Sequence, residues 1–156
     1  MTVKQIIDTL GLVPLVREGG MYLRTYESSL SVNGQPVGTA IYYLLSGEDF
    51  SHLHRLSGDE VYHFYLGDPV ELVELLPDGL SKTTILGPDI LSGQCVQHLV
   101  SAGNWQGSQL VKGGSFALLG TTMCPGYTDA MYEHGDSEAL LARYPEAREK
   151  ILQLTR

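Results

Sequence analysis

Cysteine and basic residues are scarce in this sequence, and long apolar runs are missing from it. Cys95 and Cys124 are the only cysteines among 156 residues, too few for the disulfide framework of a small secreted domain. We therefore expect two buried, reduced thiols. Lys and Arg together number 10 against 18 Asp and Glu, which gives a formal net charge of −8. Nucleic acid and anionic membrane surfaces are excluded as main partners, because binding phosphate groups requires a basic face.

Segments that would direct the chain to or through a membrane are also missing. The opening residues, MTVKQIIDTLGL, contain no long apolar stretch and no cleavage site of a signal peptide. Nowhere do about 18 consecutive apolar residues occur, so the sequence predicts no transmembrane helix. The expected location is the cytoplasm.

The residues that are abundant indicate a folded, mostly β protein. Hydrophobic residues make up 43% and charged residues 18% of the chain, which excludes intrinsic disorder. The length favours one domain over residues 1–156. The 18 glycines and 9 tyrosines suggest tight turns between strands with aromatic faces. This composition favours an all-β barrel or sandwich over a helical bundle.

Turn residues at short intervals divide the chain into expected elements. Residues 1–11 predict a short helix, capped by Thr2 and stopped by Gly11. A β-barrel is expected over about 20–125, with Asn33-Gly34 as a hairpin turn. Residues 137–156 have apolar side chains at helical spacing, with Ser137 as N-cap and Pro145 dividing them into two helices. The strands are expected at 21–28, 35–45, 50–56, 60–66, 70–76, 82–86, 94–100, 105–111 and 116–122.

The densest polar cluster lies in residues 50–67. His52 and His54 are two apart, so on a strand both imidazoles point to the same face. Glu60 follows a Ser-Gly-Asp turn and is expected on the antiparallel partner strand. Two imidazoles and one carboxylate that converge in this way could form half of a divalent-metal coordination shell. Alternation places Glu60, Tyr62 and Phe64 on one face and excludes His63 from the site.

These residues closely resemble the first motif of the cupin superfamily. Two histidines in a His-x-His pattern are followed by five residues, Glu60, six residues and Gly67, where the usual motif has three or four residues before its Glu. The segment from Gly93 to Gln106 resembles the second cupin motif. It has Ser101 where that motif has a Pro, and Gln106 where the motif has a His as the fourth metal ligand. The resemblance implies a jelly-roll barrel whose His52, His54, Glu60 and Gln106 could hold one divalent metal ion. The alternatives are that these residues do acid–base work without a metal, or only hydrogen-bond one another in a water-filled barrel mouth. Fe, Mn, Ni and Zn are the candidate ions, and no organic cofactor is expected.

Further motifs resemble one group of small single-domain cupins with sugar-epimerase-like architecture and mostly unassigned activity. They include Glu18-Gly19-Gly20, Gly103-x-Trp105-Gln106 and Pro125-Gly126-Tyr127. The sequence departs from this group at Val16-Arg17, where a His-Pro pair is common. Pairing or exchange of N-terminal strands is usual in cupins, so the resemblance implies a homodimer with a small-molecule ligand in each barrel.

The expected function is a small-molecule enzyme that isomerises, epimerises or eliminates by proton abstraction on a polar carbonyl or sugar-like substrate. His54 and Glu60 can exchange protons near neutral pH when they are buried, and Tyr62 could donate a proton or only line the barrel. Arg24 could bind a carboxylate or phosphate, or pair with a surface carboxylate. A non-catalytic ligand-binding cupin and an iron-dependent dioxygenase are the alternatives. The candidate substrate-binding residues are Tyr22, Arg24, Phe64 and Gln106.

Overall fold

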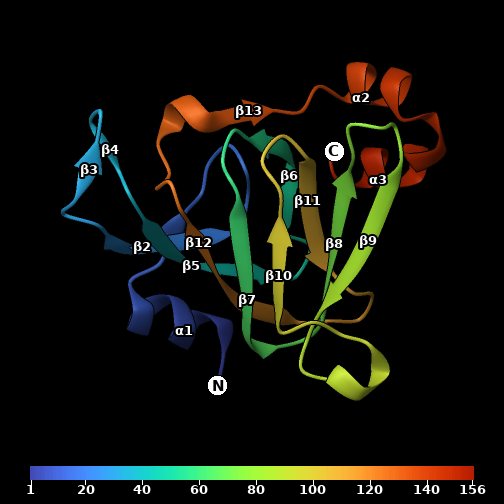
Figure 1. Ribbon diagram of the computed structural model, residues 1–156. Coiled ribbons are helices and arrows are strands. Elements are labelled where there is room, and N and C mark those ends of the chain that lie inside the picture. Colours follow the sequence, from blue (N-terminus) through green and yellow to red (C-terminus); the bar gives the residue numbers. More distant parts are fainter.

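Two antiparallel sheets face each other in the computed structural model, which describes residues 1–156 (Figure 1). The six-stranded sheet has the order β1 (Val13–Pro14), β2 (Met21–Glu27), β5 (Thr39–Ser46), β12 (Phe116–Met123), β7 (Glu60–Gly67) and β10 (Gln97–Val100). The five-stranded sheet has the order β13 (Tyr132–His134), β6 (Phe50–Leu56), β11 (Trp105–Leu110), β8 (Val70–Leu75) and β9 (Ser81–Leu86). This arrangement confirms the predicted all-β jelly roll.

One short helix precedes the strands, two follow them, and short 3-10 turns lie between strands and between the last two helices. They are α1 (Val3–Leu10), α2 (Ser137–Arg143) and α3 (Arg148–Gln153), together with the 3-10 turns η1 (Ile90–Ser92), η2 (Asp129–Met131) and η3 (Pro145–Ala147). Thr2 caps α1 and Gly11 ends it in the left-handed conformation. Asp136, one residue before the expected Ser137, caps α2 through a hydrogen bond from Ala139 N–H. None of these helices has the length and apolar character needed to cross a membrane.

The turn at Asn33-Gly34 closes a smaller hairpin than expected. Both residues have positive φ angles, 52° and 80°, and join only β3 (Ser31–Val32) to β4 (Gln35–Pro36). This hairpin stands off from the two main sheets in Figure 1. The chain then enters β5, which pairs with β2 as the sequence predicts.

The expected pairing of the His52–His54 strand with the Glu60 strand is wrong. β6 pairs with β11 and β13, whereas β7 pairs with β12 and β10 in the other sheet. The physical reason is that the Ser57-Gly58-Asp59 connection crosses between the sheets instead of closing a hairpin within one. Glu60 and His54 therefore approach each other across the interior.

Three layers of apolar side chains stabilise this arrangement. Tyr43, Tyr62, Leu72 and their neighbours fill part of the space between the sheets. The α1 helix covers one part of the outer face of the six-stranded sheet, and the two C-terminal helices cover the outer face of the five-stranded sheet (Figure 1). Cys95 is half-buried, but Cys124 is exposed because it follows the end of β12, where the chain leaves the barrel; the expectation of a buried thiol is wrong there.

Candidate active site

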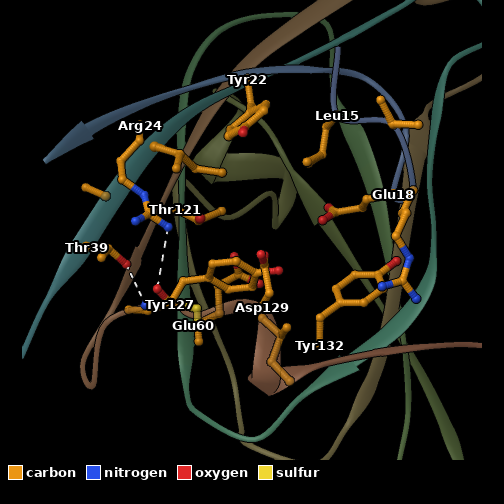
Figure 2. A pocket seen from close by; sticks show the side chains of 16 residues that line it. Leu15, Glu18, Tyr22, Arg24, Thr39, Glu60, Thr121, Tyr127, Asp129 and Tyr132 are labelled. Carbon is orange, nitrogen blue, oxygen red and sulfur yellow. Dashed lines mark hydrogen bonds between the residues drawn. The ribbon is translucent and has the colours of Figure 1, made fainter. Parts of the chain in front are cut away.

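A cavity of about 540 Å³ lies between the sheets, and Figure 2 shows the side chains that line it. Its walls come from the segment before β2, from β2, β5 and β12, from the start of β7, and from the segment around η2. Glu18 extends into it on the side opposite Arg24 in Figure 2. This volume is within the range of sites that enclose most of a small molecule.

Glu18 reaches the cavity because of the two glycines that follow it. Gly19 has a φ of 103°, and a Cβ there would lie 2.2 Å from the carbonyl oxygen of Phe50. Only glycine permits this close crossing over β6. The Tyr43 hydroxyl donates to the Gly19 carbonyl at 2.9 Å, and His52 N–H donates to the Glu18 carbonyl at 2.7 Å. The loop is thereby fixed with the Glu18 side chain directed inward.

A β-bulge in β6 brings two more polar side chains to Glu18. Gln106 pairs with His54 and Ser108 with Ser51, so β6 has one extra residue in this stretch. The Ser51 hydroxyl donates to Glu18 Oε1 at 2.9 Å, and His54 Nε2 lies 3.9 Å from Glu18 Oε2. His54 Nδ1–H donates to the His52 carbonyl at 2.7 Å, so the neutral ring presents an unprotonated Nε2 to Glu18.

Glu60 enters the same interior from the six-stranded sheet. Its Oε2 accepts a hydrogen bond of 2.8 Å from the Gln106 amide. Gln106 Oε1 and Ser108 Oγ are buried and have no hydrogen-bond partner in the protein. Unpaired buried groups of this kind cost about 1–3 kcal/mol each unless solvent or a ligand pairs with them. The interior therefore contains polar atoms whose hydrogen bonds are not all made by other side chains of the protein.

The electrostatics of this group favour neutral, proton-carrying forms. Burial raises the pKa of Glu18 to about 7, although the Ser51 hydrogen bond lowers it in part. Burial and the charge of Glu18 raise the pKa of Glu60, and this outweighs the lowering by His54, Thr121 and Gln106. Burial lowers the pKa of His54 despite the opposing effect of Glu60. Glu18 can thus exchange a proton near neutral pH, while Glu60 keeps its proton to higher pH than an ordinary Glu and His54 stays neutral to lower pH than an ordinary His.

The predicted substrate-binding and catalytic residues fall into two groups. Tyr22 and Arg24 line the cavity, and Arg24 also pairs with Glu27 and donates to the Tyr127 carbonyl (Figure 2). Tyr62 and Phe64 do not line it. Tyr62 is buried in the apolar layer between the sheets, and Phe64 packs against that layer. The structure thus contradicts a contact between ligand and these two rings, because they follow Glu60 along β7 into the packed core.

His52 does not join His54 and Glu60 at one point, which corrects the predicted convergence. Its ring stacks on that of His134 with centroids 3.9 Å apart, and its Nδ1–H donates to the Leu53 carbonyl at 2.9 Å. It lines a second, smaller hollow beside Phe50 and Arg156 instead of the cavity. The bulge is the reason, because it breaks the alternation on which the prediction rests.

The residues present do not fit the metal site implied by the cupin motif. No three His, Cys, Asp or Glu side chains are arranged to hold one metal ion. Gln106, the implied fourth ligand, is buried behind the cavity wall and gives its amide N–H to Glu60. The arrangement of Glu60 and Gln106 therefore fits a hydrogen-bonded acidic group better than the coordination shell of a metal ion.

Several cavity residues were outside the predicted set. Arg17, Glu18, Tyr132 and Asp129 line the wall, and the Tyr132 ring stacks on that of His54 with centroids 5.2 Å apart. The sequence feature that could have identified Glu18 is Glu-Gly-Gly, since two glycines after a charged residue allow the chain to pass close over a neighbouring strand. Asp129 is an exposed residue at the cavity wall, and nothing in the surrounding sequence distinguished it from the other acidic residues near the C-terminus.

Comparison with known proteins places this chain in a family. The sequence pattern described as "Cupin superfamily (DUF985)" matches residues 4–134. The chain belongs to the cupin superfamily. This cupin is similar to a protein of Shewanella oneidensis solved by X-ray crystallography, with 33% identity, a TM-score of 0.94 and coverage of 100% of this chain and 98% of that one. It is also similar to a hypothetical protein from Leishmania major, with 28% identity, a TM-score of 0.92 and coverage of 99% and 98%.

More distant structures share only the fold with this cupin. Oxalate decarboxylase of Bacillus subtilis, described with Mn(II) centres, is 12% identical with a TM-score of 0.59, and the match covers 92% of this chain and 37% of that one. A search of curated proteins gives no match.

Proposed function

We propose that this cupin is an enzyme that transfers protons on a small polar carbonyl or sugar-like substrate. The observation that supports the proposal is the buried group formed by Glu18, Glu60 and His54, in which neither carboxyl group has an Arg or Lys partner. Isomerisation, epimerisation and elimination all begin with proton removal next to a carbonyl. Each needs a base whose pKa is near the working pH.

Glu18 is the candidate base because it lines the cavity and its pKa is raised to about 7. In its ionised form it would take a proton from a substrate C–H bond, and the electron pair of that bond would move to the adjacent carbonyl. Burial favours the neutral form of His54, and its Nε2 lies 3.9 Å from Glu18 Oε2. The lone pair on that nitrogen would accept a hydrogen bond from Glu18 once the carboxyl group has taken the substrate proton.

Glu60 is the candidate acid. Its raised pKa keeps it protonated at higher pH than an ordinary Glu, and Gln106 fixes one of its oxygens. From the start of β7 it could return a proton to the substrate oxygen or carbon. No step is assigned to a metal ion, because His52 and Gln106 do not complete a ligand shell with this pair.

Proton exchange with solvent tests the proposal directly. The protein would be incubated in deuterium oxide with aldoses, ketoses, sugar acids and 2-oxo acids, and loss of C–H signals would be followed by proton NMR. We expect exchange on at least one class, lowered about 100-fold or more by Glu18→Gln. Glu133→Gln, which changes an exposed carboxylate paired with Arg55, is the matched control. Saturable binding without exchange would favour the alternative, a non-catalytic ligand-binding cupin.

We also propose that the protein is a homodimer formed through its N-terminal strands. β1 pairs with only the first two residues of β2, so the outer edge of the remaining strand is not covered by β1. Tyr26 on β2 and Val16 in the loop between β1 and β2 are exposed. Uncovered strand edges favour pairing with another chain. Light scattering after size exclusion should give twice the 17.1 kDa of one chain; a mass of one chain would contradict the proposal.

A further inference from the structure

Arg17 lies in the cavity wall next to Glu18 and makes no ion pair. It lines both the main cavity and the smaller hollow beside it, so it stands at the boundary between them. No carboxylate lies within ion-pair distance of its guanidinium, and its side chain makes no hydrogen bond within the protein. A guanidinium carries five N–H donors in a fixed fork, and all five of these remain available.

Arg17 is an exposed residue, and its guanidinium lies over one aromatic ring. Its Cζ lies 4.7 Å from the centroid of the Tyr132 ring. Tyr132 in turn stacks on His54 and brings its hydroxyl within 2.8 Å of His134 Nδ1. Cation–π contact holds the charge without using its hydrogen-bond donors. The positive charge is therefore placed at the cavity beside the proposed base, with its donors free for a ligand.

Arg24, which lies across the cavity from Glu18 in Figure 2, differs from Arg17 because it has partners within the protein. It pairs with Glu27 and donates to the Tyr127 carbonyl at 3.5 Å, so much of its bonding capacity is used within the protein. Asp129 adds a negative charge to the cavity wall. This charge repels the two negative charges of a phosphate monoester more than the single charge of a carboxylate, so the cavity favours a carboxylate as the partner of Arg17.

We infer that Arg17 binds a carboxylate of the ligand, so that the substrates are small carboxylate-bearing polar compounds such as sugar acids or hydroxy acids. The inference rests on the proposed function only for the statement that the ligand is a substrate. The carboxylate would accept the paired N–H bonds of the guanidinium. The polar remainder of the molecule would extend toward Glu18 and Glu60.

Calorimetric titration with three matched probes tests this inference. The probes are glucuronate, glucose as its uncharged counterpart, and glucose 6-phosphate as the phosphate-bearing counterpart. We expect glucuronate to bind most tightly and Arg17→Gln to weaken its binding about tenfold or more. Arg17→Lys, which keeps the charge but not the fork, should weaken it less.

Arg55→Gln is the matched control variant. Arg55 also lies over an aromatic ring, with its Cζ 4.8 Å from the centroid of Trp105, but it pairs with Glu133 and does not line the cavity. Its substitution removes the same net charge and should leave glucuronate binding unchanged. Equal weakening in both variants would show a nonspecific charge effect and overturn the inference.

The remaining outcomes are equally decisive. Glucuronate that fails to bind, or binds no better than glucose, would overturn the inference, as would wild-type affinity in Arg17→Gln. Tighter binding of glucose 6-phosphate would overturn the carboxylate assignment. Binding is measured without turnover, so Arg17-dependent binding without solvent exchange would support the inference and contradict the proposed function. Solvent exchange on neutral sugars that persists in Arg17→Gln would support the proposed function and contradict the inference about Arg17.

Discussion

Two buried acidic groups inside the same barrel are built in opposite ways. Glu74 on β8 accepts hydrogen bonds from His98 Nε2 at 2.7 Å and Asn104 at 3.1 Å, and Lys82 Nζ lies 3.6 Å away. Burial alone would raise its pKa, but these partners lower the pKa below its usual range. Glu18 and Glu60 have no such cation, and their pKa values are raised. The Glu74 cluster is satisfied within the protein, whereas the Glu18 group keeps its capacity to bind protons and ligands.

Glu74→Ala should have the largest effect on stability. Removing the carboxylate leaves His98 and Asn104 without their buried partner, so we expect the free energy of unfolding to fall by about 3–5 kcal/mol. Urea unfolding at pH 7 measures this change. Glu71→Ala is the control, because the Glu71 side chain is 19% exposed against 3% for Glu74, and loss of its pair with Lys150 should cost only about 1 kcal/mol. Equal losses of unfolding free energy in Glu74→Ala and Glu71→Ala would contradict the difference between the buried Glu74 cluster and the more exposed Glu71–Lys150 pair.

Gly19→Ala should be nearly as damaging, because it blocks the loop that delivers Glu18. Its φ of 103° and the 2.2 Å approach of a Cβ to the Phe50 carbonyl require the backbone to move. We expect a loss of roughly 3 kcal/mol in thermal or urea unfolding. Gly11→Ala, with a φ of 68° but nothing within 4 Å, should cost only about 1 kcal/mol. A loss in Gly19→Ala no larger than in Gly11→Ala would show that the loop does not need this crossing.

Glu18→Gln should stabilise the protein, and only at higher pH. The folded pKa of about 7 lies above the ordinary value of 4.5, so between these pH values the folded state binds more protons than the unfolded state. Stability from this group therefore falls as pH rises from 4.5 to 7. The variant should gain roughly 2–3 kcal/mol over wild type at pH 8 and almost nothing at pH 4. Glu74 has the opposite slope, since its contribution is present above pH 4.5 and is lost as pH falls through its lowered pKa.

Ser51→Ala should give the smallest effect. The Ser51 hydroxyl donates to Glu18 Oε1 at 2.9 Å and lowers the pKa of that carboxyl group. Without this bond, we expect the Glu18 pKa to rise by about half a unit to one unit, measured as a shift in the pH profile of solvent exchange or in an NMR titration. An unchanged titration would show that the bond does not act on the ionised form.

The fold was predictable from turn chemistry and from one motif, but the pairing of the strands was not. The boundaries of β6 follow from the polar residues that flank it, and the sequence predicts Phe50 to Leu56 correctly. Alternation alone could not show that residues 57–59 cross between sheets. It also could not show the extra residue between Ser51 and His54, which brings both side chains inward. The actual partner of His54, Glu18, lies in a loop without periodicity, so only its two following glycines marked it.

The titration of individual glutamate carboxyl groups tests the central claim most directly. Carbon-13 NMR of the side-chain carboxyl resonances, assigned with Glu18→Gln and Glu74→Gln, would follow both groups in one sample. We predict that Glu18 titrates near pH 7 and Glu74 below pH 4.5. If both carboxyl groups titrate together near pH 4.5, Glu18 is an ordinary solvated acid and the proposed proton-transfer site does not exist.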